Sequence, residues 1–447
     1  MIRRSTLFMF SLPAVLQGFM HTPAQSLVQG IYAKHAGLSL AALASAVIVT
    51  RVFDAVIDPV IGIAADAWRR RTSTHKHFLA FGTLVTILGL WQLYRPPVSV
   101  SIAYFTGWFM VAYLGWTITE IPYRAWSIEL SSEYTMRTRI QTWLGVATAV
   151  GTYAFFFVPL LGKSLGLTQS TEIDLSTLAL GAIVIAAVMP LANLIAIWRV
   201  PDGAFAARED QVHWSELWQA VRQNGPLLYF MLMFLAAGIT LAISTGVSYL
   251  FFDALGLSDK LAALSLLLAP VTLIGMPVWA AVCKRFDRQK VWALCLLATS
   301  ACYVLYGLVP PGESGLMIVG SVSMLLLFFS TCSFVVAPAT LGDIVDYGRW
   351  KLGHDHSSFY VAFFALIQKA INGVGIAIGF MLLDLLGFDA AAKTHSASDL
   401  FAIRLTSAWL PAAAILIAAP FVWRFPITRA KHEQMLREIA ARDGNAR

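Results

Sequence analysis

The chain has 447 residues, of which 58% are hydrophobic and 13% are charged, and its formal net charge at pH 7 is +7. Soluble domains carry charge on about a quarter of their residues, so this composition excludes an ordinary soluble protein. Apolar runs of about 20 residues, the length that crosses a bilayer as a helix, recur along the whole chain, whereas a transmembrane β-barrel would show alternating strands of about ten residues.

We therefore predict an all-α membrane protein with twelve transmembrane helices in two six-helix bundles. Six apolar segments precede residues 199–225, the longest polar stretch between such segments, and six follow it. This order predicts an N-terminal bundle at 1–198, a central cytoplasmic loop at 199–225, a C-terminal bundle at 226–424 and a cytoplasmic tail at 425–447. The segments lie at residues 6–30, 38–64, 78–95, 99–130, 140–163, 175–198, 226–252, 261–283, 291–310, 315–341, 358–386 and 402–424.

The positions of Lys and Arg predict the orientation of the chain. With the N-terminus in the cytoplasm, 23 of the 32 basic residues fall on the cytoplasmic side. This excess predicts that both termini are cytoplasmic. Such a basic surface faces lipid headgroups rather than nucleic acid. We expect a multi-pass protein of a bacterial cytoplasmic (inner) membrane that functions as a monomer.

The N-terminal sequence MIRRSTLFMFSLPAVLQGF is interpreted as the first transmembrane helix. A cleaved signal peptide is the alternative. Its removal would leave an odd number of spans and would break the charge pattern, so we favour the helix.

The second predicted helix carries charged residues inside an apolar segment, namely Arg51, Asp54 and Asp58. A charge at the centre of a transmembrane helix costs about 2.5–3.5 kcal/mol, so it needs a reason to be there. The two aspartates are four residues apart and share one helix face, and Pro59 predicts a kink that frees backbone carbonyls beside them. This arrangement suits Na⁺, or H⁺ with one carboxylate protonated. Alternatively, Arg51 neutralises the acids and the group only braces the bundle.

The fourth predicted helix adds Thr117, Glu120 and Arg124. Glu120 and Arg124 have the i, i+4 spacing of a simple helical ion pair. If the second and fourth helices touch, the cation-binding residues are predicted to be Asp54, Asp58, Thr117 and Glu120.

A lone lysine lies deep in the eleventh predicted helix, at Lys369. Snorkelling to the interface is difficult from that depth, so the lysine needs an acidic partner. The acids of the second and fourth helices are the natural candidates, and Lys369 would then compete with a cation for them, with Arg51 as a further charge partner.

Charged residues at the cytoplasmic ends of several helices are candidates for a gate that breaks when the two halves separate. They are Asp66, Arg69, Arg137, Asp343 and Asp346. The alternative is that they only anchor the helix ends on the positive side of the membrane.

The histidines and cysteines predict no metal site. His75, His77, His354 and His356 fall in cytoplasmic loops, where solvated side chains are expected, and no ligand spacing recurs. The four cysteines, at 283, 295, 302 and 332, lie in or at the ends of apolar segments and are expected to be packing residues. The chain also lacks a nucleophile–base pair, a phosphate-binding loop and an HExxH motif, so we expect neither an enzyme nor a cofactor, apart from a coupling ion.

Several motifs together resemble a known family. The six-plus-six layout and the loop GIAADAWRRRT after the second helix resemble the major facilitator superfamily. Within it, the pattern FDxxxDPxxGxxxD at 53–66, TEIPY at 119–123, DIVDYGRWKLG at 343–353 and the lone lysine in the eleventh helix resemble the glycoside–pentoside–hexuronide:cation symporters. The resemblance implies symport of a sugar-type solute with Na⁺, H⁺ or Li⁺. It also implies that the acids and threonine named above form the cation site, with the lysine beside it.

The resemblance is weaker at the substrate. Positions that bind the sugar in galactoside-transporting members of the family fall here at Gly18, Trp116, Arg124 and Gly145. These departures argue against a galactoside. Arg124 either holds an anionic group such as a carboxylate with its guanidinium fork or pairs with Glu120 or Glu129.

Aromatic residues are the other candidates for the substrate cavity. Tyr113 and Trp116, as well as Trp126 and Tyr360, either stack on a ring substrate or pack the bundle.

We therefore predict a secondary active transporter that carries a small organic solute together with Na⁺ or H⁺ by alternating access. A lipid or lysolipid carrier on the same fold, and a membrane sensor that transports nothing, are the alternatives.

Overall fold

The computed structural model describes residues 3–131, 133–203, 222–352 and 357–445, and almost all of this chain is helical. The segment SELWQAVRQ at 215–223, whose sequence is compatible with either a short amphipathic helix or a solvated linker, lies outside these residues except for its last two. His354 and His356 lie outside them as well. The helices are α1 (Arg4–Ser26), α2 (Val28–Ala36), α3 (Leu40–Thr72), α4 (Lys76–Tyr94), α5 (Ile102–Glu129), α6 (Tyr134–Ser164), α7 (Leu175–Arg199), α9 (Gly225–Gly246), α10 (Ser248–Ala254), η1 (Ser258–Lys260), α11 (Leu261–Arg285), α12 (Arg288–Tyr306), α13 (Glu313–Leu352), α14 (Ser357–Leu385), α15 (Ala397–Arg404), η2 (Leu405–Trp409), α16 (Leu410–Trp423) and α17 (Arg429–Asn445).

Ten helices in the described residues are long and apolar enough to cross a membrane. The two other predicted spans correspond to α1 and α5, which are 23 and 28 residues long and pack among the ten. Helices satisfy every backbone group within one segment, which a lipid environment requires. On α4, Phe81, Leu84 and Leu88 are all more than half exposed, as expected for side chains that face acyl chains.

Three predicted spans differ in detail from the observed helices. The first does not end near residue 30 but is broken at Leu27, where α1 stops and α2 begins. The seventh is broken at Val247 in the same way, and the twelfth contains a π-helical turn, η2. In contrast, α3 runs without interruption through Pro59.

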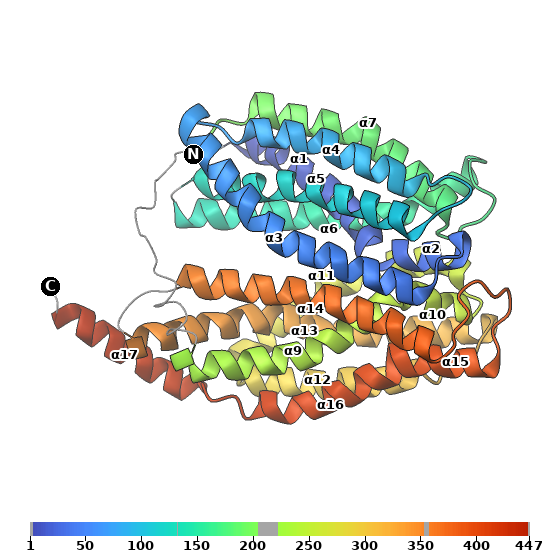
Figure 1. Ribbon diagram of the computed structural model, residues 1–447. Helices are drawn as coiled ribbons and strands as arrows, with labels where there is room; N and C mark the ends of the chain where they lie inside the picture. The colour runs from blue at the N-terminus through green and yellow to red at the C-terminus, as the bar shows by residue number, and fades with distance from the viewer. Residues whose placement is uncertain (1–2, 132, 204–221, 353–356, 446–447) are drawn as a thin grey trace.

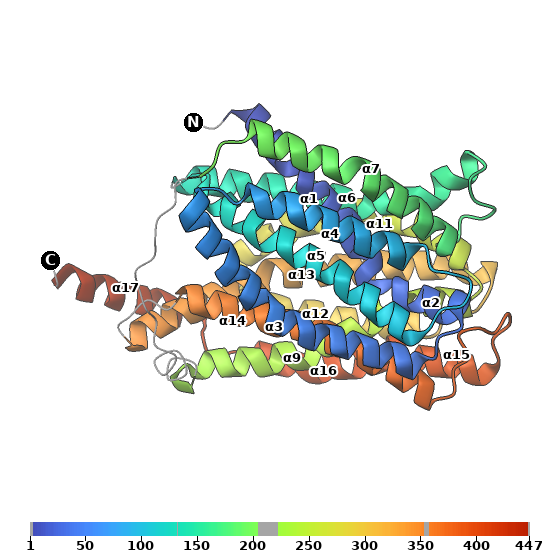
Figure 2. The same ribbon diagram turned by 45° about the horizontal axis from the view of Figure 1, so that its top comes forward.

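The helices form two bundles, which Figure 1 shows as an upper and a lower half; in the turned view of Figure 2, α3 lies beside α14. The first half contains α1 and α3 to α7, and the second contains α9, α11 to α14 and α16. The halves meet where α3 packs on α14 and α6 packs on α11. Within the first half, α3 and α6 are the second and fifth long helices; within the second half, α11 and α14 hold the same places. Each second helix thus packs on the fifth helix of the other half, which is the symmetry expected of related halves.

Small residues allow helices within the first half to approach closely. A Cβ on Gly18 of α1 would lie 2.0 Å from the backbone oxygen of Thr148 on α6, and a Cβ on Gly151 would lie 1.8 Å from that of Val15. The α4–α5 contact uses Gly89 in the same way. The hydrophobic effect does not drive helix association in lipid, so close van der Waals packing of this kind stabilises the bundle instead.

The two ends of the molecule are distinct. One end carries the start of α1 and the C-terminal helix α17, and we call it the terminal end; the opposite end carries α2, α10 and α15, and we call it the distal end (Figure 1).

Candidate functional site

The second and fourth spans of the first half touch, and this contact brings together predicted site residues. Thr117 on α5 donates a hydrogen bond of 3.0 Å to Oδ1 of Asp58 on α3. The other carboxylate oxygen of Asp58 lies 2.5 Å from the ammonium group of Lys369 on α14. Lys369 therefore has the acidic partner that its position requires, and this partner belongs to the other half of the molecule.

A second group forms around Arg51, about two turns before Asp58 on α3. Its guanidinium donates to Asp54 Oδ2 at 2.9 Å and to the Tyr113 hydroxyl at 2.7 Å. Asp54 is buried, and its Oδ1 has no hydrogen-bond partner among the described residues. The stem of Arg51 lies against α14, since a Cβ on Gly373 would be 2.2 Å from Arg51 Cγ.

A third group forms around Glu120 on α5. Trp116 Nε1 donates to its Oε2 at 2.6 Å, and Arg124 Nη2 donates to its Oε1 at 2.6 Å. The Arg124 side chain remains 74% exposed. His21 on α1 packs on the Trp116 ring with centroids 4.7 Å apart. Of the two carboxylate partners considered for Arg124, this structure uses Glu120.

The predicted oxygen cage is therefore not closed in this conformation. Asp58 and Thr117 are together, but Asp54 and Glu120 are each held by an arginine. The described residues contain no cluster of three or more His, Cys, Asp or Glu side chains that could hold a metal ion. Asp54 and Glu120 pair with arginines of their own half, whereas Asp58 pairs with a lysine of the other half.

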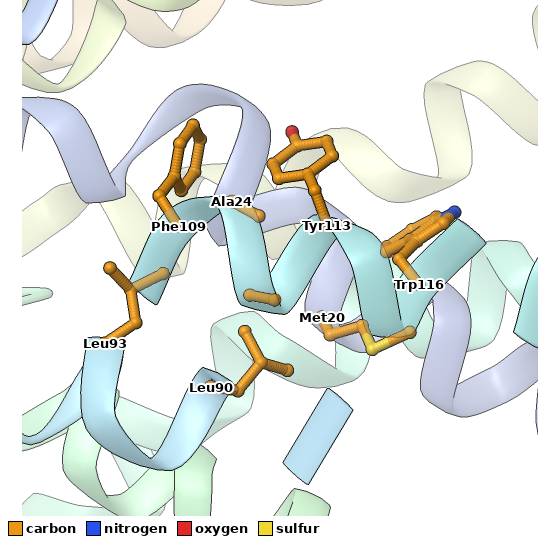
Figure 3. A pocket seen from close by; sticks show the side chains of 8 residues that line it. Met20, Ala24, Leu90, Leu93, Phe109, Tyr113 and Trp116 are labelled. Carbon is orange, nitrogen blue, oxygen red and sulfur yellow. The ribbon is translucent and has the colours of Figure 1, made fainter. Parts of the chain in front are cut away.

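The predicted substrate residues fall into different surroundings. Gly18 is buried in the α1–α6 contact and faces no cavity, so its assignment to the substrate site is wrong for this structure. Gly145 is exposed, and nothing lies within 4 Å of a Cβ built on it. Tyr113 and Trp116 line an apolar void of about 10 Å³ between α1, α4 and α5, which has room for little more than one water molecule (Figure 3).

Two other aromatic candidates are packing residues. Trp126 is buried against Phe10 and donates to the Pro201 carbonyl at 3.0 Å. Tyr360 is buried against Gly348. Neither is available to stack on a substrate in this conformation.

At the terminal end, the first half holds its own charges together. Arg69 pairs with Glu129 at 3.1 Å and donates to the Gly203 carbonyl at 2.6 Å. His75, which we expected to be solvated, is buried and lies 3.1 Å from the other Glu129 oxygen. The correction follows from its position directly before α4, where α3 and α5 cover it.

The second half has a similar arrangement. Asp343 accepts two hydrogen bonds from Arg288, at 2.9 and 2.7 Å, and His432 of α17 lies 2.8 Å from Asp346. Among the other predicted gate residues, Arg137 donates to the nearby Ser131 carbonyl and Asp66 is exposed. Each of the contacts named for these residues lies within one half of the molecule.

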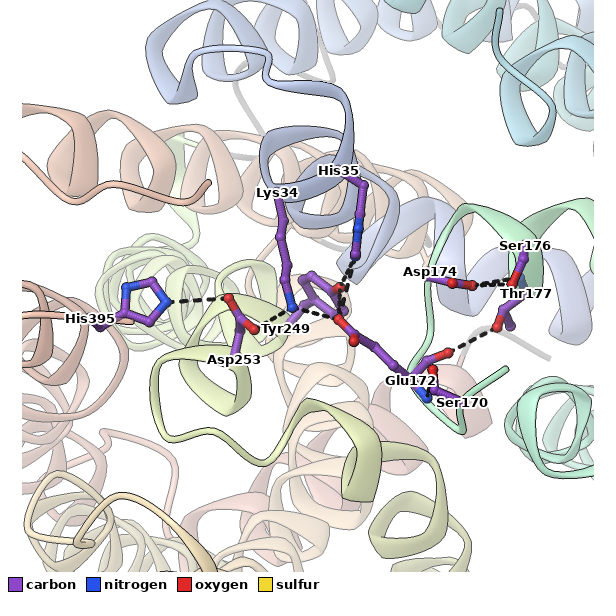
Figure 4. Close-up of polar contacts among 10 residues, drawn as sticks. All are labelled: Lys34, His35, Ser170, Glu172, Asp174, Ser176, Thr177, Tyr249, Asp253 and His395. Carbon is purple, nitrogen blue, oxygen red and sulfur yellow. Dashed lines mark hydrogen bonds and ion pairs between the residues drawn. The ribbon is translucent and has the colours of Figure 1, made fainter. Parts of the chain in front are cut away.

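The distal end, in contrast, is closed by a polar network across the halves (Figure 4). Lys34 of α2 lies 2.6 Å from Glu172 in the first half and 2.5 Å from Asp253 in the second. Tyr249 donates to Glu172 at 3.1 Å, and His395 lies 3.3 Å from Asp253. We call these five residues the distal network.

Charges in the distal network are held in place by their partners. A hydrogen bond with His35, together with those from Lys34, lowers the pKa of Glu172 to about 2 despite its partial burial. Burial favours a lower pKa for Lys34, but its bonds to Asp253 and Glu172 outweigh this and raise that pKa. The sequence did not predict this network, because its residues come from four separate segments of the chain. The one indication was Lys34 itself, a charged residue that closely follows an apolar segment.

The comparisons with known proteins agree with this architecture. Residues 9–429 match the family model described as MFS/sugar transport protein. A glucuronide carrier protein homolog of Escherichia coli strain K12 is 23% identical over 451 residues, which cover 97% of this chain and 95% of that protein. A putative glycoside/cation symporter of the same strain, YagG, is 22% identical over 440 residues, which cover 94% of this chain and 92% of that protein.

Solved structures show the same fold. The inward open conformation of the xylose transporter XylE from E. coli superimposes with a TM-score of 0.63 at 11% sequence identity, over 98% of this chain and 99% of that one. The predicted all-helical fold with the major facilitator architecture is thereby confirmed, and the protein is a multi-pass integral membrane protein. The chain belongs to the MFS/sugar transport protein family, and within it to the glycoside–pentoside–hexuronide:cation symporters that its motifs resemble.

Proposed function

We propose that this protein is a symporter that couples the movement of a sugar-type solute to Na⁺ or H⁺ by alternating access. The observation that carries the proposal is the bond between Lys369 and Asp58, because it places a positive charge from one half on a carboxylate of the other half. The names of the relatives, a glucuronide carrier homolog and a putative glycoside/cation symporter, support coupled transport and do not favour a lipid carrier or a sensor.

The proposed cation site is centred on Asp58. A Na⁺ ion takes oxygen ligands, and the Asp58 carboxylate with the Thr117 hydroxyl, 3.0 Å apart, provides the first of them. A proton on Asp58 would release Lys369 equally well, because either cation cancels the charge that holds the ammonium group. Asp54 and Glu120 contribute when the contacts with Arg51 and Arg124 rearrange.

The proposed transport cycle assigns the terminal end to the cytoplasm, in agreement with the distribution of Lys and Arg. The distal network then closes the outer side, and this conformation is one that opens inward. Transport requires residues 1–198 and 226–424 to rock as two bodies about the α3–α14 and α6–α11 contacts, with 199–225 as the connecting loop and 425–447 as a tail. We propose that one such chain works as a monomer in a bacterial inner membrane and catalyses no chemical reaction.

A thermal stability titration of the purified protein in detergent tests the ion site. Na⁺ and Li⁺ are compared with K⁺ at several pH values, since a ligand that binds the folded state raises stability by RT ln(1 + [L]/Kd). We expect a saturable shift with a coupling ion, or a pH-dependent shift for a proton, that is lost in Asp58→Asn. Asp66→Asn is the matched control, because Asp66 is an exposed acid on the same helix.

The proposal fails if Asp58→Asn responds to cations and pH as the wild type does. A shift that depends on pH alone and is lost in Asp58→Asn assigns the coupling to H⁺.

A further inference from the structure

A cavity that could take an organic solute lies in the second half. Its volume is about 380 Å³, within the range of about 300–1,000 Å³ that small-molecule sites occupy. Its walls come from α9, α12, α13, α14 and α16, and the first half contributes Gln25 from α1. The predicted substrate residues of the first half do not line it.

Uncharged polar groups gather on two walls of this cavity. Gln368 and Asn372, four residues apart, share one face of α14, and Ser330 and Ser333, three apart, share one face of α13. No hydrogen bond within the described chain engages the side-chain amides of Gln368 and Asn372. Ser330 Oγ is buried and also has no partner there. Unpaired groups of this kind in a cavity wall are suited to bind hydroxyl groups of a ligand.

The chemistry of the remaining wall narrows the ligand class. Phe234, Phe334 and Phe364 contribute aromatic surface, and Ser333 is oriented by a 2.9 Å hydrogen bond from Trp292 Nε1. The residues that line the cavity in the described chain include no Asp, Glu, Lys, Arg or His. A carboxylate moved from water into this wall would lose its hydration without gaining a counter-charge, which is strongly unfavourable.

We propose that this cavity is the substrate site, and that it selects an uncharged solute with hydroxyl groups along one edge and an apolar face or substituent opposite. The inference deepens the symporter proposal and rests on it. In this arrangement Gln368, Asn372 and Ser330 bind the hydroxyl groups, and the phenylalanines cover the apolar part. The substrate is therefore a neutral glycoside rather than a sugar acid.

The same turn of α14 connects this cavity with the proposed cation site. Lys369 follows Gln368 and reaches Asp58, while Gly373 follows Asn372 and contacts Arg51. Release of Lys369 by a cation would shift a turn whose other side chains line the cavity. Cation and solute binding are thus coupled by one helical turn, and each must strengthen the other by the same factor.

A matched pair of ligands tests the inference: 4-nitrophenyl β-glucoside and 4-nitrophenyl β-glucuronide, which differ in a neutral CH₂OH against a carboxylate. The galactoside and xyloside of the same phenol extend the neutral set. Binding is measured on the purified full chain as the thermal stability shift at up to about 10 mM ligand, with the stabilising cation present. We expect at least one neutral glycoside to stabilise the protein at about ten-fold lower concentration than the glucuronide.

Variants locate the site. Gln368→Leu and Asn372→Leu are each expected to weaken the neutral glycoside about ten-fold while the cation shift persists, and Gln368→Asn should recover part of the loss. Gln434→Leu, an exposed position on α17, is the control and should bind as the wild type does. The preserved cation shift shows that the variants are folded and separates this test from that of the cation site.

Two results overturn the inference. One is tighter binding of the glucuronide that depends on Arg124, tested with Arg124→Gln, and not on Gln368. The other is the absence of a shift with every neutral glycoside while the protein still responds to the cation.

Discussion

The ammonium group of Lys369 lies 2.5 Å from Asp58 Oδ2, and the bond joins α14 of the second half to α3 of the first. The lysine side chain is half exposed, whereas that of Asp58 is 22% exposed, so the pair lies at the edge of the space between the halves. An ion at Asp58 and the lysine therefore compete for the same carboxylate oxygen.

This competition predicts the effect of removing the lysine. Lys369→Ala frees Asp58, so the coupling cation should stabilise the protein at a concentration about 5–10 times lower than in the wild type. Coupled uptake should fall, because no internal charge replaces the cation for the return step. Lys393→Ala, an exposed lysine at the distal end, is the control. A half-maximal cation concentration equal to that of the wild type would make Lys369 purely structural.

Arg51 should matter chiefly for stability. Arg51→Ala leaves the buried Asp54 carboxylate without its cation, which typically costs about 3–5 kcal/mol. Tyr113→Phe removes one hydrogen bond to the guanidinium and should cost about 1 kcal/mol. Unfolding in detergent measures both. The double variant Arg51→Ala/Asp54→Leu should recover much of the loss, and no recovery would argue that packing of the arginine stem, rather than charge, is responsible.

Gly18 and Gly145, the two glycines that the sequence placed at the substrate site, should differ in how well they tolerate a larger side chain. Gly18→Val places a side chain where Thr148 O lies 2.0 Å from the Cβ, so α1 and α6 must separate and little folded protein is expected. Gly145→Val meets nothing within 4 Å of its Cβ and should change the free energy of unfolding by no more than about 0.5–1 kcal/mol. Monodisperse yield and melting temperature report the difference, and equal behaviour of the two variants would contradict the close α1–α6 contact.

The distal network should control how often the distal end opens. Lys34→Gln removes ion pairs on both sides of the contact between halves, so it should raise the population that is open at the distal end. Spin labels at Leu167 and Leu308, both exposed and in different halves, should report longer distances. A pair at Val98 and Leu167, within the first half, should not change.

The pH dependence of this closure follows from the shifted pKa values. Glu172 has a lowered pKa of about 2, so its contribution is present above its ordinary value of 4.5 and is lost as the pH falls toward about 2. Lys34 has a raised pKa, so its contribution is present below 10.5 and is lost at higher pH. The Lys34 pairs should therefore be constant from about pH 5 to 10. A spin-label distance in Lys34→Gln that matches the wild type throughout this range would show that the pairs do not hold the distal end closed.

The spans could be predicted from the sequence because their length and apolar character are local properties. The acidic partner of Lys369 could also be inferred, since a lysine inside an apolar helix needs a countercharge and few acids are available. The breaks at Leu27 and Val247 were not predicted, because a nearby Pro23 or Gly246 does not by itself end a helix: α3 continues through Pro59.

Packing decided the remaining sites. Gly18 was assigned to the substrate site because the sequence alone does not distinguish a glycine that lines a cavity from one that allows two helices to pack closely. His75 looked solvated because burial by α3 and α5 depends on helix ends that are distant in sequence. The amides of Gln368 and Asn372 stand on either side of Lys369 in the sequence QKAIN, but their i, i+4 spacing gained meaning only once the cavity was visible.

The exchange at Asp58 has an electrical consequence. With Lys369 bound, the carboxylate and ammonium cancel; with a cation bound in its place, the group carries one additional positive charge. A carrier that takes an uncharged solute inward in the second form and returns in the first moves one elementary charge per cycle. A membrane potential then contributes about 2.3 kcal/mol per 100 mV to accumulation of the solute, in addition to the ion gradient itself.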